Sequence, residues 1–214
     1  MNTTKISNKF FITISLATLA VLIISVLISL KIMSDIKDDN YNSIRNEMLS
    51  ILQNKINSKM EVGITNAVSV ASNADILLAI AENDKDLAYE VITDIIKKYQ
   101  NFTEFKNVKV HIHTADEKSF LRSWARDKNG DDLSSFRHTI NHVKKTQEPL
   151  SSIEVGVVGL ILRSIVPIMD EFGYNGSLEY LQGFEHLVES FRKNEKHLLV
   201  FVKSERCRRV GVRK

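Results

Sequence analysis

The residues from Phe10 to Leu30 form an apolar segment, FFITISLATLAVLIISVLISL, that contains no charged residue, no glycine and no proline. As a helix, a segment of this length spans about 30 Å, which matches the hydrocarbon core of a bilayer. The segment exceeds the apolar region of a typical secretory signal peptide, and no cleavage motif of small residues follows it. We therefore predict an uncleaved membrane-spanning helix, with a signal peptide as the alternative.

Charged residues on either side of this segment indicate its orientation. Lys5 and Lys9 precede it together with the amino terminus, whereas Lys31 and the next lysine are soon offset by three aspartates. Positively charged residues favour the cytoplasmic side of a membrane. We expect a single-pass protein of the cell membrane, with its amino terminus inside the cell and everything after Lys31 outside the cytoplasm.

Length, charge and cysteine content limit the kinds of domain and partner that the rest of the chain can have. The 214 residues suffice for one domain of ordinary size in addition to the membrane helix. The formal net charge is +3, but the basic excess lies in the final residues, RCRRVGVRK, so nucleic acid is not an expected partner. Cys207 is the only cysteine, which excludes an internal disulfide and a cysteine-rich zinc site.

A second periodic pattern follows the membrane segment. Apolar residues recur every three to four positions, as on one face of a helix, at Ile44, Met48, Ile51, Leu52, Ile56, Met60, Ile64, Ala67, Val68 and Ala71. We predict a stalk helix over residues 33–73, about 60 Å long, that ends near Asn73. So long an apolar stripe predicts burial against the chain's own domain and against a second copy, and hence a homodimer.

The pattern after residue 73 alternates between helical and strand periods. We predict helices at 74–84, 85–102, 131–147 and 185–194, strands at 108–114, 151–157, 160–169 and 175–184, and a further apolar run at 197–202. Asp131 or Asp132 is expected to cap the helix at 131–147, and Pro149 to end it. Together these elements predict an α+β fold, in which a long N-terminal helix is followed by an antiparallel sheet with flanking helices.

His111 and His113 lie two residues apart in the strand at 108–114, so their side chains share one face. Two such histidines can share a metal ion, but the sequence provides no definite third ligand, and we expect neither a metal nor another cofactor. We also predict no catalytic residue, because no serine has the glycines of a nucleophile elbow. A more remote alternative is a membrane-anchored metal-dependent hydrolase that uses His111, His113 and Asp116.

Two arginines are the strongest candidates for binding residues. Arg163 interrupts an apolar strand, where a charge needs a partner, and Glu154 or Glu179 on neighbouring strands could form a structural ion pair with it. Alternatively, Arg163 and a loop arginine clamp the carboxylate of a ligand beneath aromatic side chains. The expected ligand-binding set is Arg122, Trp124, Arg163, Phe120, His113 and Glu179.

Four segments behind the N-terminal anchor resemble one known family in their order and spacing. They are HTADEKSFLRSW, GDDLSSFR, IEVGVVGLILRSIVPI and GSLEYLQGF, and they are similar to the extracytoplasmic double Cache sensor domain of bacterial methyl-accepting chemotaxis proteins and related sensor kinases. The resemblance covers roughly residues 35–200. It implies a PAS-like, membrane-distal module that closes around a small molecule, without enzymatic activity.

The resemblance also divides the chain into parts. We expect a cytoplasmic stub and transmembrane helix at 1–32, the stalk at 33–73, the membrane-distal Cache module at 74–194, and the start of an incomplete second module with a basic tail at 195–214. In the family the chain normally continues into a second module and a cytoplasmic relay. We therefore interpret the sequence as that of a truncated or frame-disrupted receptor, with a natural end at Lys214 as the alternative.

These expectations combine into one functional prediction. The chain would sense a small anionic or zwitterionic molecule in the periplasm or outside the cell, and would pass the signal across the inner membrane as part of a chemotaxis receptor. The sensor of a histidine kinase or of a diguanylate cyclase is the alternative. Ligand binding would shift the long helix relative to its twin in a homodimer.

Overall fold

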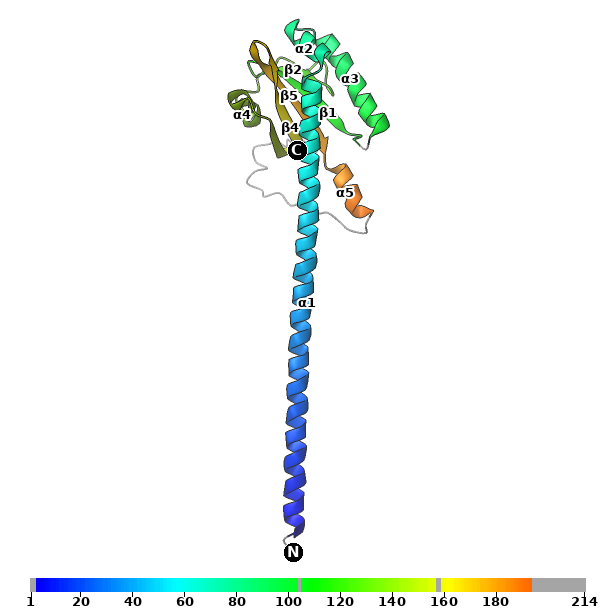
Figure 1. The fold of residues 1–214 in the computed structure, drawn as a ribbon, viewed down its shortest axis with the longest axis vertical. Coiled ribbons are helices and arrows are strands. Elements are labelled where there is room, and N and C mark those ends of the chain that lie inside the picture. Colours follow the sequence, from blue (N-terminus) through cyan, green and yellow to red (C-terminus); the bar gives the residue numbers. More distant parts are fainter. Residues whose placement is uncertain (1–2, 104, 157–158, 194–214) are drawn as a thin grey trace, which may run out of the picture. The chain divides into compact units, whose positions relative to one another are not determined.

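The computed structural model describes residues 3–103, 105–156 and 159–193 (Figure 1). Helix α1 runs without a break over Thr3–Ala71 and includes both the predicted membrane segment and the predicted stalk. Within the described residues, one helix is long and apolar enough to cross a bilayer, and its candidate span begins at Phe10. The apolar N-terminal part of α1 is therefore a candidate membrane anchor.

The chain divides into two compact units, residues 1–54 and residues 55–214. The described part of the first unit is entirely helical, and large apolar side chains remain exposed along it beyond the candidate anchor, at Ile36, Tyr41, Ile44 and Leu49. The second unit contains the last turns of α1 and all the other elements.

Helix α1 ends at Ala71, slightly before the predicted end at Asn73, because Asn73 begins the next helix. The Asn73 side chain accepts hydrogen bonds from the backbone N–H groups of Asp75 and Ile76, which caps α2 (Ala74–Ala81). Asp84 caps α3 (Lys85–Phe102) in the same way. Both helices were predicted from the apolar period, and both are present.

The sheet has five antiparallel strands in the order β2-β1-β5-β4-β3. The strands are β1 (Val108–Thr114), β2 (Ser119–Arg122), β3 (Leu150–Gly156), β4 (Gly159–Asp170) and β5 (Gly173–Gly183). The predicted α+β class, with a long N-terminal helix and an antiparallel sheet, is confirmed. Strand β2 was expected to be loop, since four residues are too few to display an alternating pattern.

The helix predicted at 131–147 is shorter than expected, because α4 covers only His138–Thr146. The residues before it form turns, in which Asp132 accepts hydrogen bonds from the backbone N–H and the hydroxyl of Ser134. The carboxylate of Asp131 binds Arg122 instead of capping a helix. The prediction that an aspartate caps α4 was therefore wrong. Helix α5 covers Glu185–Arg192, and the predicted run at 197–202 lies outside the described residues.

Both faces of the sheet are covered within the second unit. One face packs against the last turns of α1 and against α2 and α3, with Ala67, Val70, Ile76, Ile92, Val110, Ile112, Val166, Leu178 and Tyr180 in the core. A smaller cluster covers the opposite face, where α4 and the chain before it contribute Leu133, Ile140 and Val143 against Ile165. The prediction that β1 is only half buried was wrong, because α4 and its preceding turns cover the face that carries the histidines.

Candidate functional site

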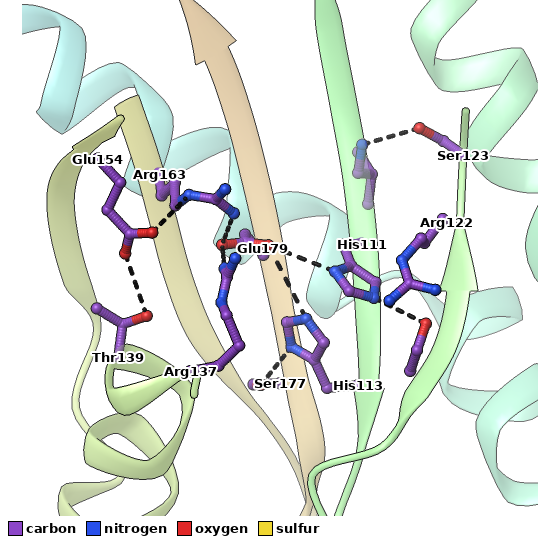
Figure 2. A network of polar contacts seen from close by, with 12 residues as sticks. His111, His113, Arg122, Ser123, Arg137, Thr139, Glu154, Arg163, Ser177 and Glu179 are labelled. Atoms are coloured by element: carbon purple, nitrogen blue, oxygen red, sulfur yellow. Dashed lines mark hydrogen bonds and ion pairs between the residues drawn. The ribbon is translucent and has the colours of Figure 1, made fainter. Parts of the chain in front are cut away.

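The candidate site lies on the sheet face that α4 covers, and its centre is the carboxylate of Glu179. In the register of the sheet, Glu179 of β5 lies opposite His111 of β1 on one side and Ile165 of β4 on the other. His113 points to the same face, since side chains two residues apart in a strand share a face. Figure 2 shows side chains from β1, β4, β5 and the start of α4 converging on this carboxylate. Glu179 is fully buried.

Two arginines bind one oxygen of this carboxylate. Arg163 Nη1 donates to Glu179 Oε1 at 2.8 Å, and Arg137 Nη2 donates to the same oxygen. Arg163 Nε also lies 3.0 Å from Glu154 Oε2 on β3 (Figure 2). Arg163 thus has the two internal carboxylate partners that the structural interpretation of the sequence named, whereas Arg137 was not among the predicted site residues.

The two histidines contact the other side of the same carboxylate. Their outer ring nitrogens meet serine hydroxyls, with 2.9 Å between His111 Nε2 and Ser119 Oγ and 2.9 Å between His113 Nδ1 and Ser177 Oγ. Their inner nitrogens face Glu179 Oε2, at 3.5 Å for His111 Nδ1 and 3.9 Å for His113 Nε2. The two rings pack edge to face, with centroids 4.1 Å apart.

Burial and the neighbouring charges together determine the protonation states of these groups. Loss of solvent lowers the pKa of His111, and it holds the pKa of His113 well below its usual value, with the neighbouring His111 ring adding to the effect. Burial alone would raise the pKa of Glu179, but contact with His111 and the charges of Arg137 and Arg163 hold that pKa well below its usual value. At neutral pH the cluster therefore contains neutral histidines around an ionised carboxylate.

Four buried polar atoms of the cluster have no hydrogen-bond partner among the described residues. They are Arg137 Nε, Arg163 Nε and, at the centre, His113 Nε2 and Glu179 Oε2. A buried polar atom without a partner costs stability and is uncommon in folded proteins.

Arg122 lies beside this cluster, in strand β2 and not in a loop as predicted. Its two terminal nitrogens each donate to one oxygen of Asp131 at 2.7 Å, and Nη1 also donates to the carbonyl of Lys128. The Arg122 side chain is 15% exposed, but the Asp131 side chain is 50% exposed. Arg122 therefore holds a carboxylate that reaches solvent, which distinguishes it from Arg163.

Trp124 and Phe120 occupy different environments. Trp124 is 43% exposed, packs its edge against the His111 ring at 5.7 Å, and receives the ammonium of Lys109 over its face at 5.5 Å. Phe120 is 3% exposed and belongs to the core formed with the helices on the other face. The structure thus brings Trp124, but not Phe120, to the histidine face of the sheet.

An open cavity of about 410 Å³ lies next to Trp124, where β1 begins and β5 ends, and no residue of the Glu179 cluster is among its lining residues. Its lining includes Trp124, Lys109 and Leu181, and also Ile96 and Gln100 of α3, the helix that packs on the opposite face of the sheet. Lys109 precedes His111 by two residues, so its side chain leaves the sheet on the same face, as does that of Leu181 relative to Glu179. The volume suits a small molecule. The sequence pattern did not reveal this cavity, because its walls come from segments far apart in the chain.

Asp116, the third residue of the hydrolase alternative, is engaged elsewhere. It lies in the exposed turn between β1 and β2, where its carboxylate contacts Lys118 Nζ at 2.6 Å and accepts a hydrogen bond from the hydroxyl of Thr114. The contacts to Lys118 and Thr114 lower the pKa of Asp116 to about 2. The structure brings His111 and His113 together with Glu179 and not with Asp116.

Comparison with known proteins places this fold in a family. Residues 41–199 match the dCache_3 family model, described as the double sensory domain of two-component sensor kinases. No curated protein sequence matches the chain. Among solved structures, the fold is similar to an extracellular domain assigned to a histidine kinase, vpHK1S-Z8, with a TM-score of 0.53 and 15% identity over 71% of this chain and 62% of that one.

Two further structures show the same likeness. The sensor domain of the histidine kinase DctB from V. cholerae matches with a TM-score of 0.52 and 8% identity, over 70% of this chain and 60% of that one. The ligand-binding domain of the Campylobacter jejuni chemoreceptor Tlp3, in complex with 4-methylisoleucine, matches with a TM-score of 0.51 and 13% identity, over 69% and 60%. The chain thus spans about 60% of the length of these structures. By its fold and its family match, this chain belongs to the double Cache family of sensor domains.

Proposed function

We propose that this chain senses a small molecule outside the cytoplasm, on the sheet face that carries Glu179, and signals through the membrane-anchored helix α1. One observation carries the proposal. In a chain of a sensor-domain family, an open cavity of about 410 Å³ is lined by Trp124, a half-exposed tryptophan that also packs against His111 of the buried charged cluster. Cavities of this size, with a few convergent polar groups, are typical of small-molecule sites.

The charges around this cavity favour an anionic or zwitterionic ligand. Lys109 lines the cavity beside Trp124. Arg122, two residues before Trp124 in the chain, is not a lining residue, and it holds the half-exposed carboxylate of Asp131. Because the Asp131 side chain is half exposed, a ligand carboxylate can compete with it for the guanidinium. The same fold in Tlp3 holds 4-methylisoleucine, an amino acid, which is zwitterionic. We assign the ligand contacts to Arg122 and Trp124.

The other predicted site residues take different parts in this proposal. Arg163, His113 and Glu179 already bind one another or their neighbours, so we assign them to the floor of the site. Phe120 belongs to the core on the other face, and we assign it no ligand contact. The three floor residues would contribute to binding by fixing the position of the sheet beneath the ligand.

Signal transfer would use the continuity of α1. Its last turns contribute Ala67, Val70 and Ala71 to the core beneath the sheet, and the helix is unbroken from Thr3 onwards. A ligand-induced shift of this core would displace the helix without refolding it. The exposed apolar side chains of the first unit support pairing with a second copy, so we propose a homodimer in the inner membrane.

Two outputs fit a sensor domain of this kind. A methyl-accepting chemotaxis receptor is the output that the sequence segments favour, whereas the family description favours a two-component sensor kinase. Reading the coding DNA beyond codon 214 in all three frames would distinguish them. A methyl-accepting coiled coil would support the receptor, and a kinase core would support the alternative.

A thermal-shift screen tests the binding proposal. The full chain, purified in detergent, would be heated with organic acids, amino acids and neutral metabolites of matched size. We expect at least one carboxylate-containing compound to raise the melting temperature, since a ligand that binds only the folded state stabilises it. Stabilisation by neutral compounds alone would contradict an anionic or zwitterionic ligand.

A further inference from the structure

We propose that His111, His113 and Glu179 form a binding site for a divalent transition-metal ion of the Zn²⁺ type. One ligand atom from each of the three side chains lies within 4.8 Å of the other two, and all three residues are buried. Two imidazoles and one carboxylate are a common ligand set for zinc. This site would be additional to the small-molecule site, and it does not depend on which molecule the domain senses.

The register of the sheet explains why the sequence did not reveal the third ligand. His111 and His113 share a face because they lie two residues apart, but the strand that supplies the next ligand begins about 60 residues later in the chain. Pairing of β5 with β1 places Glu179 directly opposite His111. A metal site of this kind depends on which strands are neighbours, and the local pattern contains no such information.

The distances at the centre are close to those that a metal ion requires. Glu179 Oε2 lies 3.5 Å from His111 Nδ1 and 3.9 Å from His113 Nε2. In a tetrahedral zinc site, ligand atoms at about 2.1 Å from the metal lie about 3.4 Å from one another. Small movements of the side chains would therefore complete the geometry. Glu179 Oε2 and His113 Nε2 are also the two central atoms without a hydrogen-bond partner among the described residues.

The outer contacts of the three side chains orient them for such a site. Hydroxyl groups of Ser119 and Ser177 meet the outer ring nitrogens of the two histidines, each at 2.9 Å. In the tautomer whose outer N–H donates to the hydroxyl, the inner nitrogen keeps its lone pair. Partners of this kind fix the ring orientation and the tautomer in known metal sites.

The charged side chains around the cluster balance one another, so no net positive charge opposes the binding of a cation. Arg137 and Arg163 bind the outer oxygen of Glu179, and Glu154 and Glu179 balance these two cations. Arg122, on the other side of His111, is balanced by Asp131.

A cobalt titration tests the site directly. The full chain in detergent, freed of metal with a chelator, would be titrated with Co²⁺ alone, and Zn²⁺ would then be added. We expect one Co²⁺ per chain, held by the three side chains and one water, with the visible absorption of a four-coordinate ion. This absorption should be lost when Zn²⁺ takes the site. The absence of this absorption at one equivalent would overturn the proposal, and no small molecule is needed, so the sensing proposal would stand.

Variants identify the ligands. His113→Ala should weaken Co²⁺ binding by at least about tenfold, and Ser177→Ala, which removes only an outer contact, by about tenfold. His142→Ala is the matched control, because this histidine is exposed on α4, and its binding should equal that of the parent chain. Near-ultraviolet circular dichroism of the metal-free variants checks their folding. Parent-like binding by both His113→Ala and Ser177→Ala, or its loss in His142→Ala, would place the ion elsewhere.

Discussion

Arg163 of β4 and Glu179 of β5 meet across the sheet, with 2.8 Å between Nη1 and Oε1, and their side chains are only 11% and 0% exposed. An ion pair so far from water depends on the presence of both partners, since either charge alone would be costly to bury. Arg137 shares the same carboxylate oxygen. The three residues thus join β4, β5 and the start of α4 into one charged cluster.

The first prediction concerns the stability that this pair provides. Arg163→Ala should lower the free energy of unfolding by about 3 kcal/mol, at the lower end of the range for broken buried pairs, because Arg137 still compensates Glu179. Denaturant unfolding followed by Trp124 fluorescence would measure the change. Arg126→Ala is the matched control, since its contact with Asp86 is exposed on both sides and should contribute little. Equal loss in the two variants would mean that the buried pair has no special role.

The second prediction concerns acid stability. The hydrogen bonds from Arg122 lower the pKa of Asp131 in the folded chain. A lowered folded pKa adds stability above the unfolded value of about 3.9, and this stability is lost as the pH falls through the folded pKa. Asp131→Asn should therefore be less stable than the parent at pH 7, by less than about 1 kcal/mol since Asp131 is half exposed, and the difference should shrink below pH 4.

Unfolding curves of the parent and of Asp131→Asn between pH 3 and pH 7 would test the direction of this pH dependence. Asp94→Asn provides a control for the loss of one surface carboxylate, since Asp94 pairs with Lys98 on the exposed side of α3. A difference between the parent and Asp131→Asn that grows as the pH falls would contradict the assigned direction.

The third prediction concerns topology. The uncharged segment Phe10–Leu30 follows two lysines, so we expect residue 100 to lie outside the cytoplasm. Alkaline phosphatase fused after residue 100 should be active, and a fluorescent reporter that works only in the cytoplasm should be dark there. An active cytoplasmic reporter and an inactive phosphatase would reverse the assignment.

The fourth prediction concerns self-association. The apolar stripe of the first unit includes Met48 and Leu52, and replacing both with lysine should weaken pairing by introducing charge into the contact. Sedimentation of the full chain in detergent would measure the effect. Leu78→Lys is the control, because Leu78 is an exposed apolar residue on α2, outside the stripe. Unchanged sedimentation of the double variant would mean that the stripe makes no contact between copies.

Elements with a clear local period were predictable from the sequence. Helices α2 and α3 and strands β1, β4 and β5 lie close to their predicted positions, because their apolar residues repeat at the helical or strand spacing. Strand β2 was missed, since its four residues are held by pairing with β1. The helix predicted at 131–147 was longer than α4, because Asp132 and Ser134 form a local turn in place of a helical cap.

The composition of the cluster was only partly predictable. Arg163 in an apolar strand indicated a carboxylate partner, and Glu154 and Glu179 were both named. Arg137 was expected to form a surface or loop-tying salt bridge, and its contact with Glu179 was not predicted, since that contact depends on how the chain before α4 crosses the sheet. The burial of His111 and His113 was missed for the same reason. Alternation along one strand shows which side chains share a face, but it does not show what covers that face.

Ligand titration of the full chain, followed by the fluorescence of its only tryptophan, Trp124, tests the central claim most directly. For a carboxylate compound found by thermal shift, Arg122→Ala should lower the affinity by about tenfold to a thousandfold. The variant removes a bidentate pair worth about 1.5 to 3 kcal/mol per hydrogen bond. The control variant Arg126→Ala should bind the compound as the parent does. Asp131→Asn should bind more tightly, because it frees Arg122 from its internal partner. Parent-like affinity in Arg122→Ala, with no gain in Asp131→Asn, would contradict a ligand held by Arg122 on this face of the sheet.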